Sequence, residues 1–202
     1  MPGVVPVELV LGRSAQAVVV LTEMRAYPTG VGLAVGVRLH RDAPRGARNS
    51  PDRPGSPDSP DTLLDMDGPE TGVDVDGPTG PAAAAEWRAA RLVWEMELAD
   101  GRRVTSAGPD PYRQLIEHGR GSVDWAPDHP VLARRSGVSH ADRAERDYWL
   151  WPLPPPGPLR VVCRWPARDI ETTVGDLDAD VIRDAAARAR PLWPDPGVGE
   201  RS

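Results

Sequence analysis

The segment "VGLAVGVRL", residues 31–39, alternates two kinds of side chain along its whole length. The apolar set is Val31, Leu33, Val35, Val37 and Leu39, and the other set is Gly32, Ala34, Gly36 and Arg38. Strict alternation is typical of an antiparallel strand that turns one face to a core and the other to solvent. The segment therefore predicts a half-buried strand in a protein built from antiparallel sheets.

Further strand patterns lie on both sides of this segment. Residues 4–11 and 15–24 precede it, and Pro6 favours an edge position for the first of them because proline cannot donate to a sheet ladder. Residues 91–106, "RLVWEMELADGRRVTS", predict a hairpin with Asp100-Gly101 at its turn. Residues 147–153 and 159–165 complete a set of about seven strands, which predicts an antiparallel β-sandwich.

A C-terminal helix is expected after the last strand. Asp176 or Asp178 can cap its N-terminus, and Pro191 stops it. Its expected apolar stripe consists of Val181, Ile182, Ala185, Ala189 and Leu192. This stripe predicts that the helix packs against a sheet.

The segment "YWLWPLPPPGPL", residues 148–159, has two interpretations. It contains a PxxP match, so it is a candidate polyproline ligand. It also lies between two strand patterns, and Pro156-Gly157 suits the centre of a type II turn. The second interpretation predicts a hairpin in which Leu150 lies opposite Cys163.

The predicted register of that hairpin also defines a candidate binding surface. Its core face would hold Leu150 and Cys163, so the opposite face would be amphipathic and suited to cation–π contact. That opposite face would carry Trp149, Trp151, Arg160 and Arg164. This face has two interpretations: either the C-terminal helix covers it, or a partner binds there, in which case these four residues are the predicted binding residues.

Several of these segments together resemble a family. "YWLWPLPPPGPLRVVCRWPARDIETT", "DADVIRDAAARARPLW", the opening "PVELVLGRSAQAVVVLTEMRAYPTGVGLAVGVRL" and "ADGRRVT" are similar to a group of uncharacterised actinobacterial proteins. The resemblance covers both ends of the chain and the middle hairpin. It implies one domain and no particular activity.

The composition changes sharply after residue 41. Residues 42–81 hold eight Pro, six Gly and nine acids against three Arg, and this excess equals the net charge of −6 of the whole chain. Such a segment buries too little apolar surface to offset its ordering entropy, so 42–84 is expected to be a disordered insertion. The predicted sandwich domain therefore consists of 1–41 and 85–194, followed by a flexible tail, 195–202.

Charge and composition also bear on partners and location. Outside the insertion acids and arginines balance, so no nucleic acid partner is expected. No run approaches the ~18 apolar residues of a membrane span, so no membrane partner is expected either. The N-terminal apolar stretch lacks a preceding positive charge, which argues against a signal peptide. Cys163 is the only cysteine, and the expected location is cytoplasmic.

Few residues suggest a catalytic or metal-binding site. His118, His129 and His140, with Asp124, Asp128 and Asp142, occupy a stretch, 107–145, that is expected to be a long loop, and they are a candidate metal or acid–base site. The "DMDG" and "DVDG" segments lack the first ligand of a calcium loop and the bidentate Glu at its last position. Cys163 alternates with Val161 and Trp165, so a buried core thiol is expected.

The sequence thus predicts no catalytic residue, no metal site and no cofactor. The favoured function is a non-enzymatic β-sandwich that serves as a protein-interaction or assembly module. The alternative is an enzyme or a small-ligand-binding protein that uses the 107–145 stretch.

Overall fold

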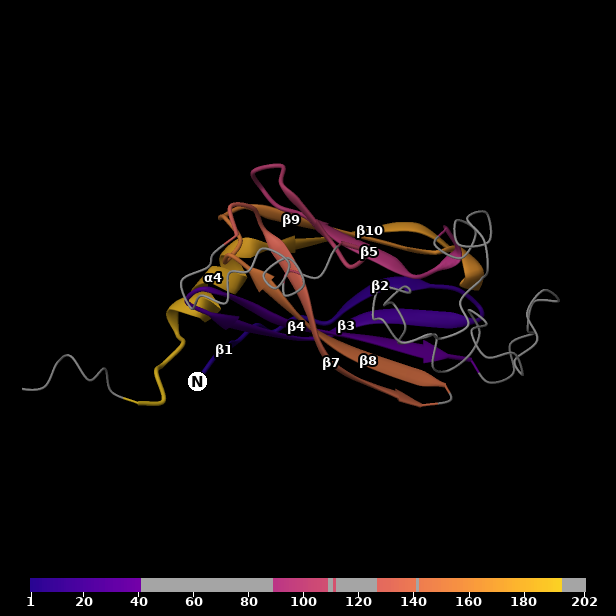
Figure 1. Cartoon of the computed structure of the whole chain (residues 1–202), viewed down its shortest axis with the longest axis horizontal. Coiled ribbons are helices and arrows are strands. Elements are labelled where there is room, and N and C mark those ends of the chain that lie inside the picture. The colour runs from indigo at the N-terminus through magenta and orange to yellow at the C-terminus, as the bar shows by residue number, and fades with distance from the viewer. Residues whose placement is uncertain (41–88, 109–110, 112–126, 141, 194–202) are drawn as a thin grey trace, which may run out of the picture.

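The computed structural model describes residues 1–40, 89–108, 111, 127–140 and 142–193. Two antiparallel sheets pack face to face, and an α-helix near the C-terminus of the described residues lies at one end of the sandwich (Figure 1). The predicted mainly-β sandwich with a terminal helix is confirmed. The predicted insertion 42–84 and the tail residues 195–202 lie outside the described residues.

The two sheets differ in size. The six-stranded sheet has the order β1-β3-β4-β8-β7, with β2 also paired to β3. Its strands are β1 (Gly3–Val4), β2 (Leu9–Arg13), β3 (Ala17–Tyr27), β4 (Gly30–Leu39), β7 (Val131–His140) and β8 (Arg143–Trp151). The four-stranded sheet has the order β10-β9-β5-β6. Its strands are β5 (Val93–Glu97), β6 (Arg103–Thr105), β9 (Pro158–Trp165) and β10 (Ile170–Asp178).

Strand β4 lies in the middle of the larger sheet, as the alternation of 31–39 predicts. Its apolar residues Val31, Leu33, Val35 and Val37 are buried in the core. The predicted strand 4–11 is divided instead into β1 and the start of β2, which both pair with β3. Both lie at the sheet edge, as Pro6 in the sequence predicts.

The predicted hairpin between 147–153 and 159–165 is wrong. Strand β8 pairs with β4 and β7, whereas β9 pairs with β5 and β10. Leu150 lies opposite Val31 and Leu132, and Cys163 lies opposite Trp94. Alternation identifies the buried residues of both strands correctly, but it cannot say which sheet they belong to because the two sheets share one core.

The proline-rich segment is therefore a corner that carries the chain from one sheet to the other. Gly157 has a φ of 111°, the positive value that the turn prediction requires. Pro154 is buried, and its carbonyl accepts a hydrogen bond of 3.0 Å from Arg183 of the helix. These contacts make the corner part of the architecture rather than a free polyproline ligand.

Two edge strands were not predicted. β7 lies inside the stretch 107–145 that was expected to be a loop, and a bulge between Arg134 and Gly137 breaks its alternation. β10 has a register shift between Ile170 and Thr173, and most of its residues are exposed. Edge strands often carry bulges and charges that prevent further pairing, and both features weaken a period-two pattern.

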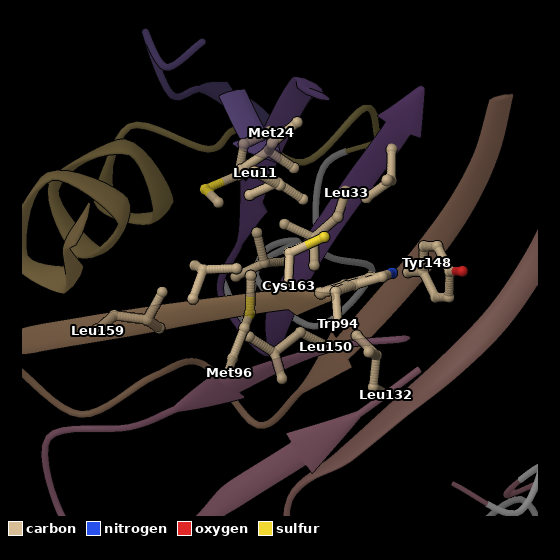
Figure 2. Close-up of a cluster of buried hydrophobic side chains, with 14 of the residues drawn as sticks. Leu11, Met24, Leu33, Trp94, Met96, Leu132, Tyr148, Leu150, Leu159 and Cys163 are labelled. Atoms are coloured by element: carbon tan, nitrogen blue, oxygen red, sulfur yellow. The ribbon is translucent and has the colours of Figure 1, made fainter. Parts of the chain in front are cut away.

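The core lies between the sheets and includes a pair of large aromatic residues. Trp94 of β5 meets Tyr148 of β8 edge to face, with ring centroids 4.8 Å apart and an interplanar angle of 88°. Figure 2 shows the indole nitrogen on the side of Trp94 that faces Tyr148. A ring face is a weak hydrogen-bond acceptor, so this geometry accounts for an indole Nε1 that has no other partner.

Helix α4 (Ala179–Ala187) follows β10 directly and packs on β1 and β3. The Asp178 side chain caps it by accepting a hydrogen bond from the Asp180 backbone N–H at 2.9 Å. A Cβ at Gly3 would lie 1.8 Å from the Ala185 carbonyl oxygen, so the helix and β1 are in direct backbone contact.

The predicted apolar stripe of the helix is only partly correct. The buried helical residues are Ala179, Ile182, Ala185 and Ala186. Val181 is 42% exposed and Leu192 is 70% exposed, because α4 ends before Leu192 and turns Val181 away from the sheets.

Candidate functional site: the outward face of the six-stranded sheet

The structure separates the four residues that the sequence places on one surface. Trp149 and Trp151 lie on β8, on the face of the six-stranded sheet that points away from the core. Arg160 and Arg164 lie on β9, on the outward face of the other sheet. The predicted Trp–Arg surface is therefore wrong, since the whole sandwich lies between the two pairs. Whether any of the four residues binds a partner is a separate question.

The outward face of the four-stranded sheet is a row of alternating charge, which we call the ion ladder. Arg103, Glu97, Arg160 and Asp176 lie opposite one another on successive strands. Arg103 pairs with Glu97 at 2.9 Å, and Arg160 pairs with Asp176 at 3.5 Å. Arg160 thus has an electrostatic partner within its own sheet.

Arg164 lies at an open depression beside the end of β9. The depression has a volume of about 630 Å³. It is lined by Arg164, Pro166, Asp169, Ile170, Glu171 and Thr172. The Asp169 carboxylate accepts a hydrogen bond of 2.6 Å from the Gln16 side chain, so it already has a partner. One cation and two anions lie in this lining, a mixture that favours no one class of ligand.

Aromatic side chains gather instead on the outward face of the six-stranded sheet. Trp149 and Tyr27 meet edge to face, with centroids 5.3 Å apart and an interplanar angle of 60°. Trp151 lies opposite Val131 on the same face. Tyr27, Trp149 and Trp151 are all half-buried. We call these three residues the aromatic patch.

Glycines of β4 form the floor of the aromatic patch. Gly32 lies directly opposite Trp149. A Cβ at Gly30 would lie 2.7 Å from Trp149 Cζ2, so any side chain there would displace the indole. Gly30, which immediately precedes the alternating segment 31–39, therefore allows the indole to lie close against the sheet, whereas a Cβ at Gly32 would approach the Tyr27 ring at 3.9 Å. Tyr27, which continues the predicted strand 15–24, is the member of the patch that sequence analysis missed.

The candidate histidine site is not assembled in the described residues. His129 precedes β7 and His140 ends it, which separates them by about 30 Å at the rise of an extended strand. His129 Nδ1 lies 2.7 Å from the Asp128 carboxylate, and this pairing lowers the pKa of Asp128. No group of three His, Cys, Asp or Glu side chains in the described residues could hold a metal ion. His118, Asp124 and the "DMDG" and "DVDG" segments lie outside those residues.

Cys163 is buried in the core, as predicted. Burial raises the pKa of its thiol to about 12, because the thiolate would lose its hydration. A thiol with such a pKa is a poor nucleophile at neutral pH.

Among the described residues, no helix is long and apolar enough to cross a membrane. Comparisons of the chain with protein-family models, with curated proteins and with solved structures found no match.

Proposed function

We propose that this chain is a non-enzymatic β-sandwich module that binds another protein through the aromatic patch. The observation that carries the proposal is the position of Trp149. This indole lies outside the core, close against Gly30 and held edge-on by Tyr27.

The physical argument concerns the cost of ordering a binding residue. Trp and Tyr are enriched among the residues that dominate protein interfaces, because they bury a large area with few rotatable bonds. Trp149 is already held by its neighbours, so a partner gains contact area with little further loss of side-chain entropy. The neighbouring Val131 is apolar and half-buried on the same face, so it adds to the surface that a partner would cover.

The rim of the aromatic patch is polar. Asp147 lies next to it on β8 and accepts a hydrogen bond of 2.8 Å from the Ser136 hydroxyl. Arg25 and Glu23 on β3 form an ion pair at 2.5 Å. An apolar centre with a polar rim is the usual arrangement of a protein-binding surface. By contrast, the distance between His129 and His140 favours the aromatic patch over the histidines as the place of binding.

The test uses peptides selected from a random 12-residue phage-displayed library on the wild-type protein. The dissociation constants of the enriched peptides are then measured for wild type, Trp149→Ser and Val174→Ser. Val174 is an exposed apolar residue on the outward face of the other sheet, so it is the matched control.

We expect at least tenfold weaker binding to Trp149→Ser and a change within twofold for Val174→Ser. Urea unfolding of each variant verifies that the domain is folded under the binding conditions. Equal binding to wild type and Trp149→Ser would contradict the proposal, as would a library that yields no peptide above an unrelated control protein.

A further inference from the structure

A row of basic residues crosses the other end of the same outward face. The pairs that define it are Arg13 with Val18, Val18 with Arg38, Arg38 with Arg143, and Arg143 with His140. Directly opposite residues of antiparallel strands project to the same side of a sheet. All four basic residues are exposed on the side of the sheet that carries Trp149. We call Arg13, Arg38, Arg143 and His140 the basic row.

The basic row is an unfavourable arrangement for a sheet on its own. Like charges directly opposite each other destabilise a strand pair, and Arg38 lies opposite Arg143. Within the described residues Arg38 has Glu145 at 3.8 Å, whereas Arg13 and Arg143 have no ion pair. An anionic group bound across the row would relieve this repulsion.

The position of the basic row relative to the aromatic patch limits the shape of a ligand. Neighbouring strands lie about 4.8 Å apart, so Arg38, Arg143 and His140 span about 10 Å. Arg143 and Trp149 lie on the same strand, six residues apart in sequence, which corresponds to about 20 Å. An extended segment of six or seven residues is therefore long enough to reach both.

Three acids lie on the surface between the two ends, Glu23, Asp147 and Glu145, so the carboxylates of such a segment would lie on the basic row and its uncharged residues between the ends. The outward-facing residues of this surface include Val10, Val20, Gly36, Glu145 and Val138, which lie in one row. Val10 and Val138 are exposed. Glu145 is the single acid of this row, and it lies beside Arg38.

We infer that the partner segment is an acidic, extended peptide. It places an apolar side chain on the aromatic patch and two or more carboxylates on the basic row, about 20 Å away. This inference rests on the proposed function, since it names the chemistry of the partner for the same face. Because the chain has a net charge of −6, the attraction is local to the basic row rather than a property of the whole molecule.

The test compares peptides that differ only in charge. A selected peptide that binds through Trp149 is synthesised in its acidic form and with every Asp and Glu replaced by Asn and Gln. Both forms are titrated into wild type, into the double variant Arg13→Gln/Arg143→Gln, and into the control Arg103→Gln/Arg160→Gln. The control removes the same charge from the ion ladder of the other sheet.

We expect the acidic peptide to bind wild type about five- to tenfold more tightly than its amide form, which is the effect of two or three exposed ion pairs. The advantage should disappear in Arg13→Gln/Arg143→Gln, persist in the control, and shrink between 50 and 300 mM NaCl because salt screens exposed charges.

Two results would overturn the inference. One is a selected peptide set without acidic residues, or equal binding of the acidic and amide forms. The other is tighter binding of a 12-nucleotide oligothymidylate than of the acidic peptide, which would assign the basic row to nucleic acid. In either case, if peptide binding still depends on Trp149, the proposed function stands. If peptide binding does not depend on Trp149, both the proposed function and the acidic-peptide inference are contradicted.

Discussion

The two outward faces of this sandwich both belong to antiparallel sheets, but their side chains are arranged differently. On the four-stranded sheet, cations and anions alternate from strand to strand, so the charges of the ion ladder neutralise one another. On the six-stranded sheet, like charges stand side by side at one end and aromatic rings lie over glycines at the other. The charged residues of the ion ladder on the first face are therefore paired within their own sheet. The second face holds exposed groups that a partner would pair and cover.

Both faces lie on sheets that share one buried core, and a charge placed in that core is expected to have the largest effect on the free energy of unfolding. Ile182 of α4 is 2% exposed, and the adjacent Val181 is 42% exposed. Ile182→Asp should lower the free energy of unfolding by roughly 3 kcal/mol or more, because an unpaired charge would enter an apolar contact. Val181→Asp, the matched control, should change it by about 0.5 kcal/mol. Urea unfolding measures both, and an Ile182→Asp variant as stable as wild type would show that the helix is not part of the core.

The corner at Gly157 is what directs β8 and β9 into different sheets, and thus Trp149 and Arg160 to opposite faces. Gly157→Val should destabilise the domain by roughly 1–3 kcal/mol, because a β-branched residue tolerates a φ of 111° poorly and its Cβ would lie 3.2 Å from that of Ala99. Pro156→Ala at the exposed neighbouring position should have a much smaller effect. A neutral Gly157→Val in urea unfolding would mean that the corner does not constrain the two sheets.

The free energy of unfolding should depend on pH through a group in the core between the two faces, Cys163. The pKa of Cys163 rises from 9.0 to about 12 on folding, so the thiol stays neutral in the folded state while it ionises in the unfolded state. Its contribution to stability is complete below pH 9 and is lost as the pH rises toward 12. At pH 10 the loss should be about 1.4 kcal/mol relative to pH 8.

The Cys163→Ala variant isolates that contribution. It creates a small cavity, so its absolute stability is lower at every pH. Its decline between pH 8 and pH 10 should nevertheless be smaller than that of wild type. Parallel stability curves for the two proteins would show that Cys163 ionises in the folded state as readily as in the unfolded chain.

The smallest effect is expected on the ion ladder itself. Glu97→Gln with Arg160→Gln removes two opposite charges and should change the free energy of unfolding by less than about 1 kcal/mol, because exposed ion pairs contribute little. A loss above about 2 kcal/mol would mean that this face is a structural network, and the contrast between the two faces would then concern stability rather than binding.

The architecture follows from sequence wherever a strand is long and regularly alternating. The pattern of 31–39 predicts β4, and the Asp100-Gly101 turn predicts the β5–β6 hairpin, in which Gly101 has a φ of 81°. The cap at Asp178 and the buried Ile182 follow from helical spacing in the same way. These features are local, so the residues that determine them are close together in the sequence.

The candidate site required information that local patterns do not hold. Alternation indicates that Trp149 faces away from Leu150, but not that β4 rather than β9 lies beside it. The bulges in β7 and β10 interrupt the pattern at the strands that would have revealed the pairing. The position of Trp149 against Gly30 follows only from the pairing of β4 with β8.

The most direct test of the central claim is a map of where a ligand binds. Isotope-labelled protein is titrated with a selected peptide, and amide chemical shifts are followed by NMR. The account predicts that the shifting residues of the sheets lie on β2, β3, β4, β7 and β8, from the Trp149 end to the Arg143 end, while β5, β9 and β10 stay unchanged. Shifts centred on the ion ladder at Glu97, Arg160 and Asp176 would contradict it.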